Sequence, residues 1–228
     1  MTDSASLPGS RSGAALLALP TGALLWPERR LLVVSDLHLG KAQRMARRGG
    51  AFLPPYETLD TLSRLQGVVD ATGPETVLCL GDSFDDDEAA RALHEPEATA
   101  LRLLMRGRRW IWVEGNHDPG PLPWGGERAA EAVLGPLTFR HIARPGASGE
   151  VSGHYHPKAA VGGASRPCFL WDRDRVVMPA FGTYTGGLPV GSAALQALMG
   201  PGALAVLTGH RALAIPMPRQ GRALGRAS

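Results

Sequence analysis

The chain has 228 residues, of which 29 are glycine and 19 are proline, well above the usual fractions of about 7% and 5%. This turn-rich composition argues against a helical bundle or coiled coil, and the 44% of hydrophobic residues excludes a disordered chain. The net charge of +3, from 24 basic and 21 acidic residues, is too small to indicate nucleic-acid binding by itself.

The hydrophobic pattern predicts the elements in chain order. Residues 1–13 are small and polar, and we expect them to be disordered. Residues 22–26 and 31–36 flank a PERR turn and predict a β-hairpin, and leucines at helical spacing predict a helix over 56–71. The remaining expected elements are a strand at 76–80, a helix over 88–106, a strand at 110–114 and short strands near 137–142, 150–153, 168–172, 175–179, 203–208 and 211–216.

The order of these elements predicts one α/β domain. Helices alternate with strands early and strands dominate late, which favours a sandwich of mixed sheets flanked by helices over residues 14–217. A loose basic tail at 218–228 would follow. Cys79 and Cys168 lie in apolar segments and predict buried thiols in a cytoplasmic protein, and no segment predicts a membrane span.

Polar side chains follow the ends of several predicted strands. The carboxyl ends of parallel strands meet at one edge of a sheet, where loops from several strands form ligand sites. The groups at these positions are Asp36-Leu37-His38, Gly81-Asp82, Gly115-Asn116-His117-Asp118, His141 and Gly153-His154-Tyr155-His156.

The histidine distribution predicts a metal site. Five of the seven histidines belong to this set, interleaved with carboxylate and amide oxygens, a mixture that suits Zn, Mn or Fe better than Ca or Mg. Because residues i and i+2 of an extended strand point the same way, Asp36 with His38, and His154 with His156, can each direct two groups to one edge. Glycines just before the Asp82, Asn116 and His154 positions allow sharp turns and close approach.

These five blocks, in this order, resemble the calcineurin-like metallophosphoesterase superfamily, with its pattern DxH, GD, GNH[DE], H and GHxH. The resemblance implies a four-layer α/β/β/α sandwich with two mixed sheets and a site for two divalent transition-metal ions, Mn most of all, with Zn and Fe as alternatives. One ion would be held by Asp36, His38 and His156 and the other by Asn116, His141 and His154, with Asp82 bridging both. His141 has no local motif around it, and His210, in the probable turn TGHRA, is a poor substitute for it.

The same resemblance implies phosphodiester hydrolysis by a metal-activated water. His117 would protonate the leaving alkoxide, and Asp118 would either orient His117 or cap the turn before Pro119.

The segments DLHLGK, LGDSFDD, SGHYHP and PAFGTYTGGL are similar to the DNA ligase-associated metallophosphoesterases, over about residues 20–216. This likeness implies a Mn-dependent endonuclease of single-stranded DNA that acts in DNA repair with a helicase and a ligase. Such proteins commonly carry a histidine after GDSF, where this chain has Asp85. This departure leaves any supporting role of Asp85 without an account. The sequence also gives no account of a catalytic role for Tyr184 in GTYTGG.

Several residues allow two interpretations. Lys41, Arg44, Arg47 and Arg48 could contact DNA phosphates or form a solvated helix face. Trp124 and Tyr155 could stack on a base, whereas Trp110 and Trp112 fit the core better. The alternative functions are a general phosphodiesterase or phosphatase of small molecules and a non-enzymatic scaffold with the same fold.

Overall fold

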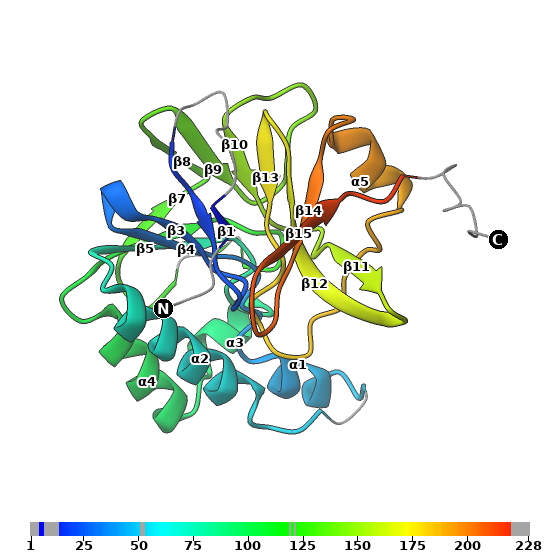
Figure 1. Cartoon of the computed structure of the whole chain (residues 1–228). Coiled ribbons are helices and arrows are strands. Elements are labelled where there is room, and N and C mark those ends of the chain that lie inside the picture. Colours follow the sequence, from blue (N-terminus) through cyan, green and yellow to red (C-terminus); the bar gives the residue numbers. More distant parts are fainter. Residues whose placement is uncertain (1–4, 7–13, 51–52, 119, 121, 220–228) are drawn as a thin grey trace.

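The computed structural model describes residues 5–6, 14–50, 53–118, 120 and 122–219, and it consists of two mixed β-sheets with helices on their outer faces (Figure 1). The predicted α/β class and pair of mixed sheets are therefore confirmed. Most of the expected disordered segment 1–13 and basic tail 218–228 lies outside the described residues. Within residues 1–13, however, Ala5–Ser6 form strand β1, which pairs antiparallel with β2 at the edge of the first sheet.

The first sheet has the order β1-β2-β3-β4-β5-β6-β7. Its first strands pair antiparallel, whereas β4 to β7 run parallel to one another. Strand β4 is buried along its whole length, as the run of apolar residues predicts. The strands are β2 (Leu17–Ala18), β3 (Leu24–Trp26), β4 (Leu31–Val34), β5 (Thr76–Leu80), β6 (Arg109–Val113) and β7 (Glu127–Ala129).

The second sheet has the order β15-β14-β12-β13-β10-β9-β8, with β11 paired to β12. Strands β9, β10 and β13 are parallel neighbours, and the other pairs are antiparallel. The strands are β8 (Glu131–Leu134), β9 (Leu137–Arg140), β10 (Glu150–Ser152), β11 (Lys158–Val161), β12 (Ala164–Trp171), β13 (Arg175–Val177), β14 (Leu204–Leu207) and β15 (Leu213–Pro216).

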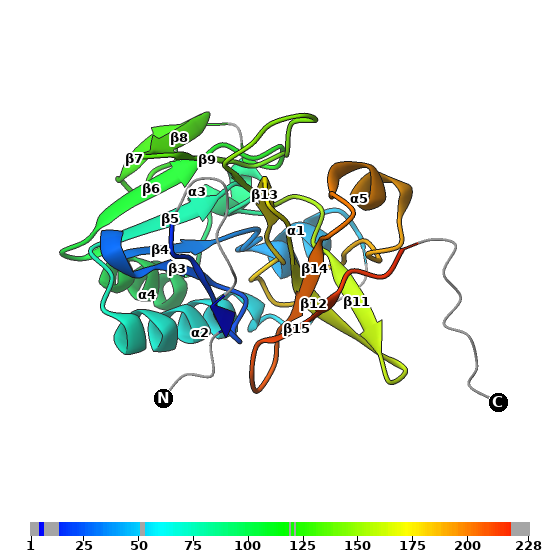
Figure 2. The ribbon, with the colours of Figure 1, turned by 45° about the horizontal axis from the view of Figure 1, so that its top comes forward.

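Side chains that alternate along the strands divide the core into three apolar layers. Leu31 and Val33 of β4 join Phe169 and other residues of the second sheet between the two sheets. Their neighbours Leu32 and Val34 face the opposite way. Figures 1 and 2 show the resulting sandwich, with the helices of the first sheet and α5 on opposite sides.

Helices cover the outer faces unequally. Helices α2 (Glu57–Thr72) and α4 (Glu95–Met105) pack on the first sheet, against strand residues that include Trp110 and Trp112. Both tryptophans are buried, which confirms their assignment to the core. The second sheet carries only the short α5 (Ala193–Leu198) and the β11 segment on its outer face. The remaining helices are the 3-10 turn η1 (Pro27–Arg29), α1 (Lys41–Arg47) and α3 (Asp87–Arg91).

One predicted helix is wrong as a continuous element. Residues 88–106 form two helices, α3 and α4, separated at residues 92–94. Pro96 lies in the first turn of α4, where it needs no backbone partner, but it could not continue a helix that began eight residues earlier. The Glu97 side chain accepts a hydrogen bond from the His94 backbone N–H at 2.9 Å and marks the new helix start.

Five strands and the helix α5 were not expected from the sequence; the strands are β1, β2, β7, β8 and β11. Strand β12 also begins at Ala164 rather than near residue 168, because β11 and β12 form a hairpin that extends it. Among the helices of the described part of the chain, none is both long enough and apolar enough to cross a membrane.

Candidate metal centre

The predicted ligand loops converge on one edge of the sandwich. Parallel strands β4, β5 and β6 of the first sheet end just before Asp36, Asp82 and Asn116. Parallel strands β9 and β10 of the second sheet end just before His141 and Gly153. The carboxyl ends of both sheets therefore direct their loops to the same place.

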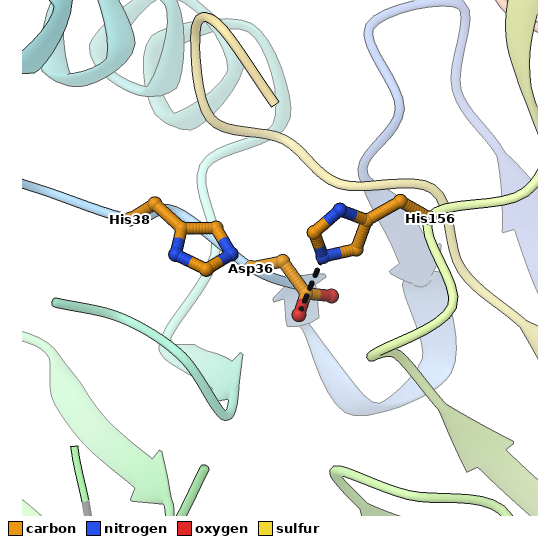
Figure 3. A group of neighbouring side chains, drawn as sticks. All are labelled: Asp36, His38 and His156. Atoms are coloured by element: carbon orange, nitrogen blue, oxygen red, sulfur yellow. Dashed lines mark ion pairs between the residues drawn. The ribbon is translucent and has the colours of Figure 1, made fainter. Parts of the chain in front are cut away.

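The first group of candidate metal ligands consists of Asp36, His38 and His156 (Figure 3). Their donor atoms lie within 4.8 Å of one another, and His156 Nε2 is 3.0 Å from Asp36 Oδ1. The two imidazole rings meet edge to face with their centroids 5.4 Å apart. Asp36 also accepts hydrogen bonds from the Ser35 hydroxyl and from the His154 backbone N–H, so its carboxylate links the two sheets.

The second group consists of Asp82, His141 and His154, with Asn116 beside them. Three polar atoms surround His141 Nε2: Asn116 Oδ1 at 3.0 Å, His154 Nδ1 at 3.2 Å and Asp82 Oδ2 at 3.3 Å. His141 Nδ1 lies 3.1 Å from the Leu80 carbonyl, which fixes this edge of the imidazole ring. His210 is exposed in the loop between β14 and β15, so His141 is the histidine that joins this group.

These residues fit two divalent transition-metal ions. His38 Nε2 and His156 Nε2 are buried and lack a hydrogen-bond partner in the described part of the chain. His156 Nε2 is close to Asp36 but without hydrogen-bond geometry, so both nitrogens present a lone pair to the space beside the carboxylate. Four imidazoles, two carboxylates and one amide oxygen form a donor set typical of Mn, Fe or Zn. Ligands of this kind need only deprotonation, not rearrangement, to hold an ion.

Backbone strain is concentrated at the ligands. Asp36, His38, Asp82, His154 and His156 all adopt left-handed φ angles, between 45° and 68°. The prediction that Asp36 and His38 are extended strand residues is therefore wrong, because β4 ends at Val34 and the chain then turns. Such conformations cost about 1–3 kcal/mol each and persist where the surrounding structure enforces them.

Glycines before the ligands allow close contact. Of these three glycines, only Gly81 has a left-handed φ, although the chain bends directly after Gly115 and Gly153 as well. A Cβ on Gly115 would overlap the Asp82 backbone and carboxylate, and one on Gly153 would overlap the Ser35 hydroxyl. These two glycines therefore provide space for neighbouring loops rather than unusual backbone freedom.

Gly153→Ala is expected to lower the free energy of unfolding by about 1–3 kcal/mol and to weaken metal binding, because Ser35 and Asp36 must move. Gly67→Ala is the control: Gly67 is exposed in α2 with open space around it, and alanine there should raise stability by about 0.5–1 kcal/mol. Urea unfolding of both variants measures the difference. A Gly153→Ala protein as stable as the parent would show that the loops are not packed as described.

Charge coupling in the second group favours the ionised forms of Asp82 and His141. Burial opposes ionisation of Asp82, but the hydrogen bond and charge of His141 outweigh it and lower the pKa of Asp82 to about 2. Burial likewise disfavours the cation of His141, yet Asp82 and Asp36 raise its pKa. Burial and the neighbouring His141 lower the pKa of His154. A divalent ion bound here would replace the proton of His141, so metal binding should release protons.

His117 lies beside both groups. Its Nδ1 is 3.0 Å from the Asp85 carbonyl, which can only accept, so Nδ1 carries a proton. Its Nε2 is 4.0 Å from Asp82 Oδ2, and its side chain is 32% exposed. The ring therefore turns Nε2 toward the metal ligands while remaining open to solvent.

Asp118 contacts backbone rather than the His117 ring. Its carboxylate accepts hydrogen bonds from the backbone N–H groups of Ser83, Phe84 and Gly115, at 2.8, 3.1 and 3.2 Å. These bonds tie the loop after β5 to the loop after β6, which is a use that neither sequence interpretation foresaw. Burial raises the pKa of Asp118 to about 6, against the lowering effect of these amides.

The basic residues of α1 are paired with acids. Arg44 and Arg47 form ion pairs with Asp85, Asp86 and Glu88 near the start of α3, at 2.7 to 3.8 Å. Arg48 lies 3.9 Å from Asp86, whereas Lys41 forms no ion pair within the described residues. Asp86 also caps α3, since its side chain accepts a hydrogen bond from the Ala89 backbone N–H.

Trp124 and Tyr155, the two residues that could stack on a base, lie in different surroundings. Trp124 stacks on Phe84 and donates its indole N–H to the Ala90 carbonyl, so it belongs to the helix-side core. Tyr155 is half-buried with its ring 5.1 Å from that of His154. The Tyr184 hydroxyl lies 3.1 Å from that of Tyr56 at the start of α2.

Sequence reasoning missed two residues that contact the ligands. Ser35 donates to Asp36, and Asp85 lies 2.9 Å from His38 Nδ1. The GDSFDD segment drew attention to Asp85. Its contact with the His38 ring, however, depends on how the loop after β4 pairs with the loop after β5.

Two groups of candidate metal ligands meet at one edge of a sandwich of two mixed sheets, which is the arrangement of a metallophosphoesterase. The sequence matches the Calcineurin-like phosphoesterase family over residues 29–210, and the chain belongs to this family. The predicted enzyme class, a hydrolase of phosphodiester bonds, is confirmed.

Among solved structures, the chain is similar to the Pseudomonas putida nuclease MPE, with 28% identity and a TM-score of 0.73, over 92% of this chain and 100% of that one. The E. coli phosphoesterase Yfce is more distant, with 13% identity and a TM-score of 0.37, over 82% of this chain and 99% of its own. A comparison with curated proteins gives no match.

Proposed function

We propose that the protein is a Mn-dependent endonuclease that hydrolyses phosphodiester bonds in single-stranded DNA. The observation that carries this proposal is the presence, at one edge, of two groups of candidate metal ligands and a fifth imidazole, that of His117, whose Nε2 faces them. The likeness to a nuclease over nearly the whole of both chains supports a nucleic-acid substrate over a small phosphoester.

A cavity beside the second ligand group provides space for a substrate that extends beyond the metal site. It has a volume of about 420 Å³, and its charged lining residues are Glu114, Glu131, Arg140 and Arg144, next to Asn116 and His141. Arg140 is held by Glu131 and Glu150, whereas the Arg144 side chain is 67% exposed and contacts Glu131 at 3.2 Å. A nucleotide next to the scissile phosphate would fit in this space.

The charge of the ligand set favours a phosphate. Asp36 and Asp82 supply two negative charges against four positive charges from two divalent ions, so the occupied site would be cationic. When bound, the ions would activate a water and neutralise the phosphate oxygens. His117 would protonate the leaving alkoxide from Nε2 while its Nδ1–H stays on the Asp85 carbonyl.

Three further parts of the proposal follow from the resemblance. The protein would act in DNA repair with a DNA ligase and a helicase. Lys41, with Arg44, Arg47 and Arg48 of α1 and with Tyr155, would contact the DNA, the arginines after exchange of their acidic partners. A cytoplasmic location would agree with the two buried free thiols, Cys79 and Cys168.

The test compares cleavage of single-stranded DNA, double-stranded DNA and bis-p-nitrophenyl phosphate, each with Mn²⁺, Zn²⁺, Mg²⁺ or EDTA. We expect Mn-dependent internal cleavage that is faster on single strands and abolished by EDTA. Hydrolysis of the small diester with intact DNA would instead indicate a small-molecule phosphodiesterase. Bound metal without turnover of any phosphoester would indicate a scaffold.

A further inference from the structure

Asp85 connects a proposed metal ligand to helix α1. Its Oδ1 lies 2.9 Å from His38 Nδ1, and its Oδ2 accepts a hydrogen bond from Arg44 Nη1 at 2.7 Å. The side chain is 1% exposed, so both contacts are shielded from water. A buried carboxylate held on both oxygens is fixed in position rather than freely rotating.

The backbone around Asp85 is fixed as well. His38 and Leu39 donate their backbone N–H groups to the Asp82 and Ser83 carbonyls, each at 3.0 Å, and Asp85 donates back to the Leu39 carbonyl at 3.0 Å. Leu39 and Phe84 form a parallel bridge between the same two segments. Backbone hydrogen bonds therefore join the loop after β5 to the loop that carries His38. They restrict movement of the Asp85 carboxylate away from the His38 ring.

These contacts set the proton positions on two imidazoles. An ionised carboxylate can only accept, so His38 Nδ1 carries a proton, and the buried, unpartnered Nε2 is the nitrogen left available to a metal. The Asp85 backbone carbonyl imposes the same arrangement on His117, whose Nδ1 lies 3.0 Å away. The two rings meet edge to face at 5.1 Å, so one residue aligns both.

We propose that Asp85 is a positioning residue: its carboxylate fixes the tautomer and orientation of His38 for metal binding, and Arg44 holds that carboxylate in place. The proposal rests on the proposed function in so far as His38 is a metal ligand. It gives the departure at this position a purpose, because a carboxylate here can accept from the Nδ1–H of a metal ligand.

The first measurement uses the full-length, metal-free protein with ¹⁵N-labelled histidine. Long-range ¹H–¹⁵N correlation spectra report which nitrogen of His38 carries the proton. We expect the proton on Nδ1 in the parent protein and a loss of that preference in Asp85→Ala. A parent protein with its His38 proton on Nε2 would overturn the proposal without any variant.

The second measurement is a titration with Mn²⁺ followed by electron paramagnetic resonance of the free ion. Asp85→Asn, which keeps the side-chain shape, and Asp85→Ala should weaken one of the two Mn²⁺ sites by about 10–100-fold. Glu88→Gln is the matched control, since it removes a nearby acid that pairs only with Arg47 and is 67% exposed, and it should leave both affinities unchanged. Equal affinities in the parent and both Asp85 variants would overturn the proposal.

The outcomes separate this proposal from the proposed function. If the parent protein binds no Mn²⁺, the proposed function fails, and the His38 tautomer still decides whether Asp85 orients the ring. If the parent binds two ions and the Asp85 variants bind them equally well, only the positioning role fails. Arg44→Met should weaken the same site less than Asp85→Ala, because the carboxylate would remain beside His38.

Discussion

Asp82→Ala is expected to lower kcat/KM for DNA cleavage by about 10³-fold or more and to reduce the metal content of the protein. Asp82 contributes one of only two carboxylates in the ligand set, and it lies 3.3 Å from His141 Nε2. Its other oxygen accepts a hydrogen bond from the His117 backbone N–H at 2.9 Å. Metal-based charge stabilisation amounts to several kcal/mol, and each 1.36 kcal/mol of lost transition-state stabilisation corresponds to tenfold in rate.

The control for this substitution is Asp70→Ala, which removes an exposed carboxylate of α2 that contacts only Gln66. It should leave both activity and metal content unchanged. Metal analysis of the purified proteins and steady-state kinetics with Mn²⁺ measure the two effects. Full metal content in Asp82→Ala would remove the bridging assignment of this residue.

His117→Ala is expected to reduce kcat by about 10²–10⁴-fold on DNA while both ions remain bound, because general acid catalysis contributes rates of that order. The effect should depend on the leaving group. The alkoxide of a DNA sugar needs a proton, whereas p-nitrophenolate leaves readily without one. Cleavage of bis-p-nitrophenyl phosphate by the variant should therefore remain within about tenfold of the parent.

His210→Ala serves as the control, since His210 is exposed in a distant loop. Loss of metal in His117→Ala would make His117 a ligand instead, a role for which its place near His38 and Asp85 provides the geometry. Equal losses on the DNA and p-nitrophenyl substrates would argue against proton donation to the leaving group.

The sequence predicted strands β3 to β6 of the first sheet because β4 and β5 are buried apolar runs followed by polar loops. Leu31 to Val34 and Val77 to Leu80 are continuously apolar, and both lie in strands. The edge strands β7 and β8 were missed because short segments such as Glu127–Ala129 have no alternating pattern and gain their pairing from neighbours. The break before α4 was foreseeable, since Pro96 stood in the expected helix.

The candidate ligands were identified from their places at strand ends, but their surroundings were not. The contacts of Asp118 and Asp85 join loops that are about 35 and 47 positions apart in sequence. Local spacing cannot reveal which amides or rings a carboxylate will meet across such distances. The left-handed backbone at Asp36 and His38 was also hidden, since neither residue type requires it.

Anomalous diffraction from crystals grown with Mn²⁺ tests most directly whether two ions occupy this centre. We expect two peaks per chain, one bounded by Asp36, His38 and His156 and the other by Asn116, His141 and His154, with the Asp82 carboxylate between them. A single peak, or peaks outside these residues, would contradict the two-metal site on which the proposed nuclease activity depends.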